Sequence, residues 1–432
     1  MSFRPHFDFV EELRWRGLLH DTMPGTQELL NSERVSGYCG FDPTADSLHI
    51  GNLVPITLLI LLQKAGHKPI ALVGGATGMV GDPSGKSDER KLLDVSQIEH
   101  NLNCQKQQLM KFLDFENVEN RAEMVNNYDW FGKFGFLEFI RDVGKHITVN
   151  YMMGKDSVKN RLEGGGMSFT EFSYQLVQGY DFYHLYTQRG CKLQLGGSDQ
   201  WGNITTGTEL IRRKTGGEAF AITAPLITKS DGTKFGKSEG GNIWLDRNKT
   251  TPYRFYQFWL NVADEDAVRF IKIYSLKSRS EIEKLIAEHS GQEHLRILQK
   301  ALAEEMTERV HSAEDLALSI KATDVFFGGG SSEDLSSLDT ETLKSSLEGM
   351  EKFTIKTADL SGGIQVLDLL AQYTQIFPSK GEARKMIQAQ AVSINKEKYT
   401  DINGTIDSSF LLHGKYLLVQ KGKKNYFVVE VV

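Results

Sequence analysis

Two short segments, about 180 residues apart, carry side chains suited to binding a nucleotide. In the first, His49 and Gly51 stand at the start of an apolar helix predicted over residues 53–62. Free backbone N–H groups and the helix dipole favour an anion at such a place. In the second, Lys234 and Lys237 lie three residues apart around a glycine, as a flexible pair of positive charges. Together the two segments predict a site for nucleotide phosphates.

Each segment alone has a more ordinary interpretation. A histidine and a glycine at a helix start often form a capping turn, and a lysine-rich loop is usually a solvated surface. The flanking sequences make the pair more specific. The first segment follows Tyr38-Cys39-Gly40-Phe41-Asp42-Pro43-Thr44, and the second follows Thr228-Lys229-Ser230-Asp231-Gly232-Thr233. We therefore interpret both as parts of one site.

Alternating strands and helices are predicted around the first segment. Residues 35–41 have the pattern of a strand, residues 53–64 that of a helix, and residues 69–73 that of a second strand. This order predicts an α/β fold with a parallel sheet, whose ligands bind at the carboxyl ends of the strands. Residues 194–203 have the pattern of another strand, which ends in a glycine turn and opens a helix.

A second group of polar side chains recurs at helical spacing. Tyr174, Gln178 and Asp181 stand at i, i+4 and i+7, which places a phenol, an amide and a carboxylate on one face of a helix. Spacing alone equally fits a solvated stripe beside the core residues Phe172 and Leu176. Beside the two nucleotide segments, we interpret this face as part of a substrate pocket.

The two segments are similar to the HIGH and KMSKS signatures of class I aminoacyl-tRNA synthetases. Over essentially its whole length the chain resembles the bacterial tyrosyl type of this family. Asn52 stands where the family commonly has histidine, and Phe235-Gly236 replaces Met-Ser, as in many tyrosyl-type members. The resemblance implies that L-tyrosine attacks ATP, accompanied by Mg²⁺, to form tyrosyl-adenylate and pyrophosphate. The tyrosyl group then passes to the 3′ end of tRNA(Tyr).

The resemblance also implies a role for individual residues. Tyr38 and Asp181 face the phenolic hydroxyl, and the buried pair would be left unsatisfied by phenylalanine. The implied catalytic residues are Thr44, His49, Lys86, Arg90, Lys234 and Lys237. The implied tyrosine-binding residues are Tyr38, Asp82, Asn127, Tyr174, Gln178, Asp181 and Gln200. The implied ATP-binding residues are Gly40, Asp42, His49, Gly51, Asn52, Asp199, Lys234, Lys237 and Ser238.

The C-terminal part of the chain has a different charge from the rest. The net charge is −6, yet residues 353–432 hold ten Lys and Arg against seven Asp and Glu, a local balance of +3. These residues resemble the S4 RNA-binding module, with predicted helices at 366–373 and from 379, and strands at 391–395, 416–420 and 426–429. Each basic side chain alone is more often merely solvated. As a cluster, the candidate RNA contacts are Lys380, Arg384, Lys385, Lys396 and Lys398.

We expect five segments. They are a Rossmann-like catalytic domain (1–225) with a dimer-forming insertion near 124–153, the lysine loop and connector (226–250), a helical domain (251–326), a linker (327–352) and the S4-like domain (353–432). The homodimer contact is implied by the resemblance, and the aromatic composition of the insertion is compatible with it.

Composition excludes several other classes of protein. Cys39, Cys104 and Cys191 have no paired spacing, so neither a disulfide framework nor a zinc site is supported, and no protein-held metal is expected. With no apolar N-terminal stretch and no run of some 18 apolar residues, a cytoplasmic protein without membrane partners is expected. Two alternatives stay open, namely a synthetase-derived RNA-binding or regulatory protein without catalysis, and tryptophanyl-type specificity. Intact His49, Lys234 and Lys237 argue against the first, and the C-terminal module against the second.

Overall fold

The structure is a computed structural model that describes residues 3–84, 93–163, 166–233, 235–238, 241–422 and 425–432. Contacts divide the chain into two units. The first comprises Met1–Thr250 and Trp259–Val310, and the second comprises Thr251–Phe258 and His311–Val432. The two units are therefore described separately.

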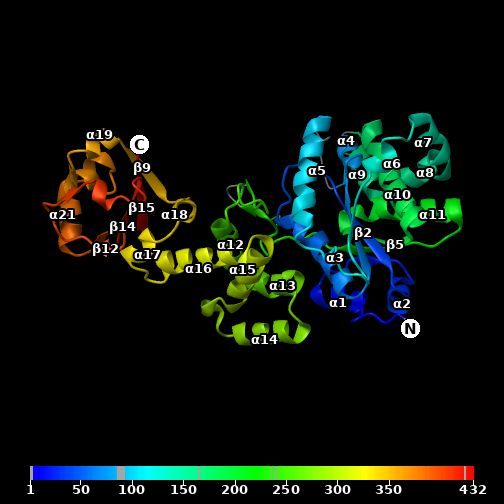
Figure 1. The fold of residues 1–432 in the computed structure, drawn as a ribbon, viewed down its shortest axis with the longest axis horizontal. Coiled ribbons are helices and arrows are strands. Elements are labelled where there is room, and N and C mark those ends of the chain that lie inside the picture. Colours follow the sequence, from blue (N-terminus) through cyan, green and yellow to red (C-terminus); the bar gives the residue numbers. More distant parts are fainter. Residues whose placement is uncertain (1–2, 85–92, 164–165, 234, 239–240, 423–424) are drawn as a thin grey trace. The chain divides into compact units, whose positions relative to one another are not determined.

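A six-stranded sheet organises the first unit (Figure 1). Its strands are β1 (Asp21–Thr22), β2 (Ser36–Phe41), β3 (Lys68–Val73), β4 (Glu123–Asn126), β5 (Cys191–Gly197) and β6 (Phe220–Ala224), in the order β1-β6-β5-β2-β3-β4. All neighbours are parallel except the edge strand β1. The chain moves outward from β2 through β3 to β4, and then from β5 to β6 on the other side of β2. The switch point between β2 and β5 is where such sheets bind ligands, and the predicted α/β class is confirmed.

Helices cover both faces of this sheet. They are α1 (Phe9–Arg16), α2 (Thr26–Ser32), α3 (Leu53–Lys64), α4 (Thr77–Val80), α5 (Val95–Leu109), α6 (Tyr128–Phe131), α7 (Phe136–Asp142), α8 (Val149–Met153), α9 (Asp156–Glu163), α10 (Phe169–Arg189) and α11 (Trp201–Thr215). Figure 1 shows α3 and α5 on one side of the strands and α10 and α11 on the other.

Two helices fix the position of the pocket residues. The helix predicted over 53–64 forms as α3 with those bounds, and it is buried on nearly all sides because it is apolar all round. The helix α10 begins in a capping box between Ser168 and Glu171 and ends at Gly190 in the left-handed conformation. Its face with Tyr174 and Asp181 is buried toward the sheet.

A helical segment completes the first unit. It contains α13 (Asp264–Tyr274), α14 (Arg279–His289) and α15 (Ile297–Val310), and it follows the short hairpin of β7 (Lys237–Ser238) and β8 (Gly241–Asn242). The helix α13 packs on α15 and on α3, so the helical segment is part of the core of the first unit. The expected helical domain of residues 251–326 is thus shared between the two units.

The second unit is built on a five-stranded sheet of order β12-β11-β14-β15-β9. Its helices are the start of α12 (Pro252–Leu260), α16 (Ala313–Phe327), α17 (Ser332–Ser336), α18 (Thr340–Ser346), α19 (Thr357–Leu360), α20 (Val366–Asp368) and α21 (Lys380–Gln388). Its strands are β9 (Glu351–Ile355), β10 (Ile364–Gln365), β11 (Val392–Ile394), β12 (Glu397–Lys398), β13 (Thr405–Ile406), β14 (Tyr416–Lys421) and β15 (Asn425–Val431). The predicted helix over 366–373 forms as α20 and a π-helical turn, Leu369–Tyr373.

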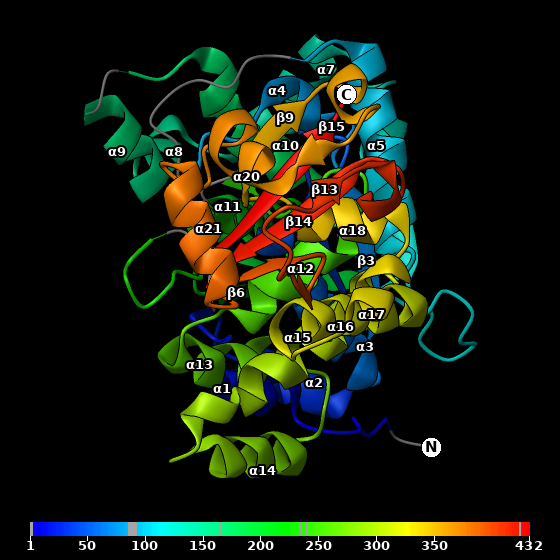
Figure 2. The ribbon, with the colours of Figure 1, turned by 90° about the vertical axis from the view of Figure 1, so that its left-hand side faces the viewer.

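Both faces of this sheet are covered (Figure 2). Helices α20 and α21 pack on one face, while α16, α17 and α18 pack on the other. Residues 327–352 were expected to form a linker. In the structure they contain two short helices and contribute to the core of this unit. Leu335, Leu338 and Leu343 are buried against strands β14 and β15, and Ser331 and Asp339 cap the two short helices.

Candidate active site

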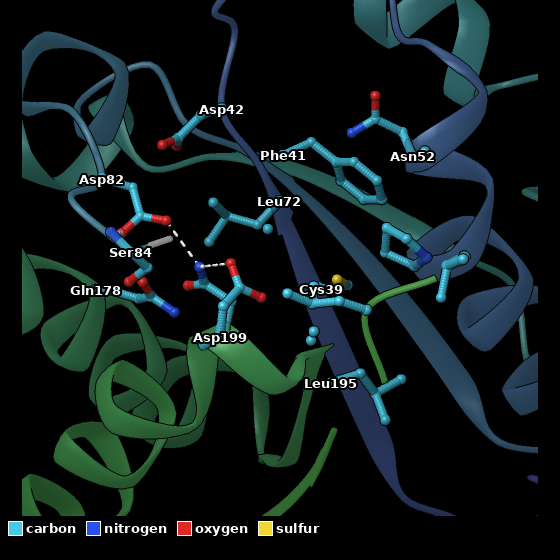
Figure 3. A pocket seen from close by; sticks show the side chains of 18 of the residues that line it. Cys39, Phe41, Asp42, Asn52, Leu72, Asp82, Ser84, Gln178, Leu195 and Asp199 are labelled. Atoms are coloured by element: carbon cyan, nitrogen blue, oxygen red, sulfur yellow. Dashed lines mark hydrogen bonds between the residues drawn. The ribbon is translucent and has the colours of Figure 1, made fainter. Parts of the chain in front are cut away.

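The predicted site residues converge on one cavity of about 560 Å³ at the carboxyl ends of β2 and β5. Figure 3 shows Asp42, Asp82 and Gln178 on one side of it and Asn52 on the other. The predicted residues that line it are Tyr38, Gly40, Asp42, Thr44, His49, Gly51, Asn52, Asp82, Tyr174, Gln178, Asp181, Asp199 and Gln200. The polar face of α10 is therefore a pocket wall and not a solvated stripe.

His49 caps the turn that leads into α3. Its Nδ1 accepts a hydrogen bond from the Gly51 N–H at 3.0 Å, and the Asn52 Oδ1 accepts one from the His49 N–H at 3.0 Å. Because Nδ1 is an acceptor, the neutral imidazole carries its proton on Nε2. The capping interpretation and the binding interpretation are thus compatible. The cap holds a hydrogen-bond donor at the edge of the cavity.

A buried carboxyl group marks the opposite region of the pocket. Asp181 accepts hydrogen bonds from Asn127 Nδ2 at 3.0 Å and from Trp130 Nε1 at 2.9 Å. Burial raises the pKa of Asp181 to about 8, against the effect of these two donors. The nearby Tyr38 hydroxyl is buried and has no hydrogen-bond partner within the described ranges, and burial and then Asp181 raise its pKa. This arrangement suits a ligand hydroxyl.

A chain of hydrogen bonds joins this region to the start of the first segment. Asn127 donates to Thr77 Oγ1 at 3.1 Å, Thr77 donates to Asp42 at 2.7 Å, and the Tyr174 hydroxyl donates to Asp42 at 2.9 Å. Asp42 thereby serves the protein's own network, and Tyr174 is also part of the cavity lining. Burial raises the pKa of Tyr174, so the phenol stays protonated.

Acceptors gather where α11 begins. Asp82 accepts hydrogen bonds from Gln200 Nε2 at 2.7 Å and from the Ser84 N–H at 3.0 Å. Its Oδ1 also accepts a long one from Asn203 Nδ2 at 3.5 Å. The side-chain oxygens of Gln178 and Gln194, both in the lining, are buried without a partner in the described part of the chain. A carboxylate with nearby unsatisfied carbonyl oxygens suits a ligand ammonium group.

Sequence reasoning missed several of these residues. Asn127 was predicted, but Thr77, Trp130, Gln194 and Asn203 were not. The glycine-rich turn that contains Thr77, directly after the strand at 69–73, was the available signal. For Trp130 the sequence offered only an aromatic residue in a segment expected to form an interface.

The lysine segment is described only in part. Lys86, Arg90 and Lys234 lie outside the described residues, as do the side chains of Lys237 and Ser238. The backbone nevertheless brings the two segments together. The Ile50 N–H donates to the Ile243 carbonyl at 2.9 Å, and the Leu245 N–H donates to the Leu48 carbonyl at 2.9 Å.

The candidate RNA contacts divide into two groups. Arg384 and Lys385 are exposed on α21. Lys380 pairs with Asp368, and Lys398 donates to the Gln390 carbonyl at 2.6 Å. Lys396 is engaged inside the unit, because its Nζ donates to the Phe326 carbonyl at 3.0 Å and lies 5.0 Å from the centre of the Tyr426 ring.

Other kinds of site find little support. In the described ranges, no three His, Cys, Asp or Glu side chains are grouped so that they could hold a metal ion. Burial raises the pKa of the Cys39 and Cys191 thiols to about 12. No described helix has the length and apolar character needed to cross a membrane.

Comparisons with known families cover most of the chain. Residues 30–328 match a family model described as tRNA synthetases class I (W and Y). Residues 342–429 match a model described as a tyrosine–tRNA ligase SYY-like C-terminal domain.

Relatives and solved structures agree with these matches. A tyrosine–tRNA ligase of Bacteroides thetaiotaomicron is 61% identical over 98% of this chain and 99% of its own, and one of Cytophaga hutchinsonii is 59% identical over the same shares. The crystal structure of a C-terminally truncated mitochondrial tyrosyl-tRNA synthetase of Aspergillus nidulans has a TM-score of 0.67 and 33% identity, covering 74% of this chain and 94% of that one. A tryptophanyl-tRNA synthetase of Encephalitozoon cuniculi bound to tryptophan shares only the fold, with a TM-score of 0.51, 13% identity and shares of 78% and 90%.

The raised pKa of Asp181 predicts a pH effect on stability. Unfolding returns this carboxyl to an ordinary pKa of about 4, so the folded state binds its proton more tightly. The stabilisation is complete below pH 4 and is lost as the pH rises toward about 8. We therefore expect the difference in free energy of unfolding between Asp181→Asn and the wild type to shift in favour of the variant as the pH rises from 5 to 9. Urea denaturation measures this, with Asp129→Asn at an exposed position of the same unit as control; equal slopes for all three proteins would contradict the prediction.

Proposed function

Because this chain belongs to the tyrosine–tRNA ligases of the class I tRNA synthetases, we propose that its pocket activates L-tyrosine with ATP and that the activated tyrosyl group passes to the 3′ end of tRNA(Tyr). The observation that carries this proposal is a pair of buried groups. One is the Asp181 carboxyl, and the other is the Tyr38 hydroxyl, which has no hydrogen-bond partner among the described residues. A phenolic hydroxyl placed between them would satisfy both groups, at a cost to any substrate that lacks it.

The remaining lining residues receive complementary roles. The substrate ammonium binds Asp82, Gln178 and the Tyr174 oxygen, whose own proton is directed to Asp42. Gln200 faces the substrate carboxylate side. The nucleotide lies along Gly40, Asp42, Gly51, Asn52 and Asp199.

The first chemical step needs no general base. The substrate carboxylate is already a nucleophile, and it forms a bond to the α-phosphorus of ATP while the bond to the bridging oxygen breaks and pyrophosphate departs. The protein's contribution is therefore orientation and charge stabilisation. His49 Nε2, with Thr44, donates to the transferring phosphate. Mg²⁺ enters with ATP, held by phosphate oxygens and water.

The departing pyrophosphate requires positive charge. We assign this role to Lys86, Arg90, Lys234 and Lys237, with Ser238 as a further donor to the nucleotide. Their positions in the sequence support the assignment, because they closely follow Asp82 and Ser84 or lie close to Phe235, and these three residues line the pocket. The reaction is expected in the cytoplasm, where tRNA and ATP are available.

Tyrosine-dependent exchange of pyrophosphate into ATP tests the proposed function. We expect exchange with tyrosine, and we expect Tyr38→Phe to reduce the tyrosine to phenylalanine ratio of kcat/KM by roughly tenfold, about 1.4 kcal/mol, because one hydrogen bond to the substrate is lost. The free energy of unfolding should stay within about 0.5 kcal/mol, since this hydroxyl has no partner in the described protein. Exchange with tryptophan instead would indicate the tryptophanyl alternative, and bound RNA without any adenylate would indicate a non-catalytic protein.

We further propose that the exposed basic face of α21 contacts tRNA. Arg384 and Lys385 are exposed there, within the residues 342–429 that match a tyrosyl-type C-terminal domain. Their charges would meet backbone phosphates, which position RNA without reading its sequence. Lys396 is a poorer candidate, because its ammonium group already bonds within the unit.

Replacing both exposed residues with alanine should weaken tRNA aminoacylation and leave adenylate formation unchanged. We expect KM for tRNA to rise roughly tenfold, and the slope of log affinity against log salt to fall by about 1 to 2, as expected for two lost phosphate contacts. Lys344→Ala, an exposed lysine of the same unit, serves as control. An unchanged salt slope would contradict the proposed contact.

We also propose that the protein forms a homodimer through α6, α7 and α8. Large apolar side chains are exposed along these helices, and Leu137 is 80% exposed. A second copy would cover this surface, which includes Tyr128, Phe136, Leu137, Ile140, Val149 and Met153.

A charge placed on this surface should separate the subunits. We expect Leu137→Glu to sediment as a monomer at micromolar concentration, where the wild type sediments as a dimer, because a carboxylate would be buried unpaired at the interface. Val118→Glu, at a 95% exposed position elsewhere in the unit, should leave the dimer intact. A dimeric Leu137→Glu protein would place the interface elsewhere.

A further inference from the structure

We propose that one face of α13 holds the lysine segment in its working position, with Phe235 as the anchor. The inference rests on the proposed function, because the lysines on either side of Phe235 act on pyrophosphate there. It adds Phe235 as a positioning residue for adenylate formation, and it gives helix α13 a part in that reaction.

Phe235 is inserted into a box of buried aromatic rings. Its ring centre lies 4.7 Å from that of Phe270, 5.5 Å from that of Tyr274 and 5.8 Å from that of Trp259. Phe235 is 8% exposed, and the three rings around it are almost completely buried. Burying a phenylalanine side chain is worth roughly 1.5–3 kcal/mol, with a further contribution from each edge or offset ring pair. This burial fixes the backbone at position 235 against α13.

The helix α13 also binds the residues that precede the lysine segment, Thr228 and Ser230. Asp266 accepts hydrogen bonds from the Ser230 N–H at 3.0 Å and from the Ser230 hydroxyl at 3.2 Å. Arg269 donates to Asp266 at 2.8 Å and to the Thr228 carbonyl. Asp266, Phe270 and Tyr274 stand at i, i+4 and i+8, and therefore on one face of α13. A polar attachment and an apolar one thus lie on either side of residues 231–234.

The first nucleotide segment fixes the other side. Gly236 has φ +87°, and a Cβ there would overlap Ile50. The Gly236 carbonyl accepts from the Ile243 N–H at 3.0 Å, and the Ile243 carbonyl accepts from the Ile50 N–H at 2.9 Å. Phe235 and Gly236 are therefore held between α13 and the turn that carries His49.

The anchored pair lies between two lysines in the sequence. Lys234 and Lys237 flank Phe235 and Gly236, so in this proposal a shift of the anchor would shift both lysines. Stabilisation of a departing anion depends on donors that are already in place, and a misplacement of about 1 Å can cost roughly 100-fold in rate. The edge of Phe235 also reaches the cavity lining, so the test must separate anchoring from direct contact with the nucleotide.

Variants of the anchor and of its box make that separation. In tyrosine-dependent pyrophosphate exchange, we expect Phe235→Ala to lower kcat roughly 30-fold while KM for tyrosine stays within about twofold. Phe235→Met should retain kcat within about threefold, because methionine fills an irregular apolar space. Phe270→Ala, which leaves Phe235 in place but opens the box, should lower kcat similarly. The double variant should be no slower than the worse single variant, because both act through one contact.

Loss of stability needs its own control. Phe9→Ala removes a ring of matching burial from the same unit, away from the pocket lining, and it should lose stability while its kcat per titrated active site is unchanged. Phe270→Ala provides the same comparison should the Phe235→Ala variant fail to fold. Unchanged kcat in Phe235→Ala or, in its place, in Phe270→Ala, an equal rise in KM for tyrosine, or additive losses in the double variant would overturn the inference. A wild type without exchange would instead overturn the proposed function on which it rests.

Discussion

Burial of the Asp181 carboxyl group is the constraint on which the pocket depends. A carboxyl away from water must be surrounded by hydrogen-bond donors, and these come from elements distant in the sequence. Asn127 follows β4, and Trp130 lies on α6. Asn127 also holds Thr77 of α4, which in turn holds Asp42 after β2. One buried group on α10 thus sets the mutual positions of the ends of β2 and β4 and of the helices α4 and α6, and these elements shape the pocket.

The two units carry different features of the protein. In the first unit, backbone hydrogen bonds connect the first nucleotide segment to the strand region that follows the second. Helix α3, which follows the first segment, packs against helix α13. The second unit is a sheet with helices on both faces, so that its exposed basic residues project from a well-packed body. The pocket and the exposed basic residues of α21 therefore belong to separate cores within one chain.

Local sequence patterns predicted those features that depend on local physics. The bounds of α3 followed from its apolar run, and the polar face of α10 followed from helical spacing. Features that depend on tertiary partners were not predicted. Thr77 gains its role only through Asp42, and the leucines of residues 327–352 become a core only against β14 and β15. Lys396 was interpreted from its charge, but its ammonium group lies against Tyr426 and the Phe326 carbonyl.

The cap formed by His49 has a consequence for how this site can vary among related sequences. A Cβ at position 51 would lie 2.8 Å from the His49 imidazole, too close for any side chain. The imidazole in turn depends on the Gly51 N–H to hold its tautomer. The two positions therefore depend on each other. A substitution at either position would displace or remove the His49 imidazole from the pocket, even if every other residue of the site stayed the same.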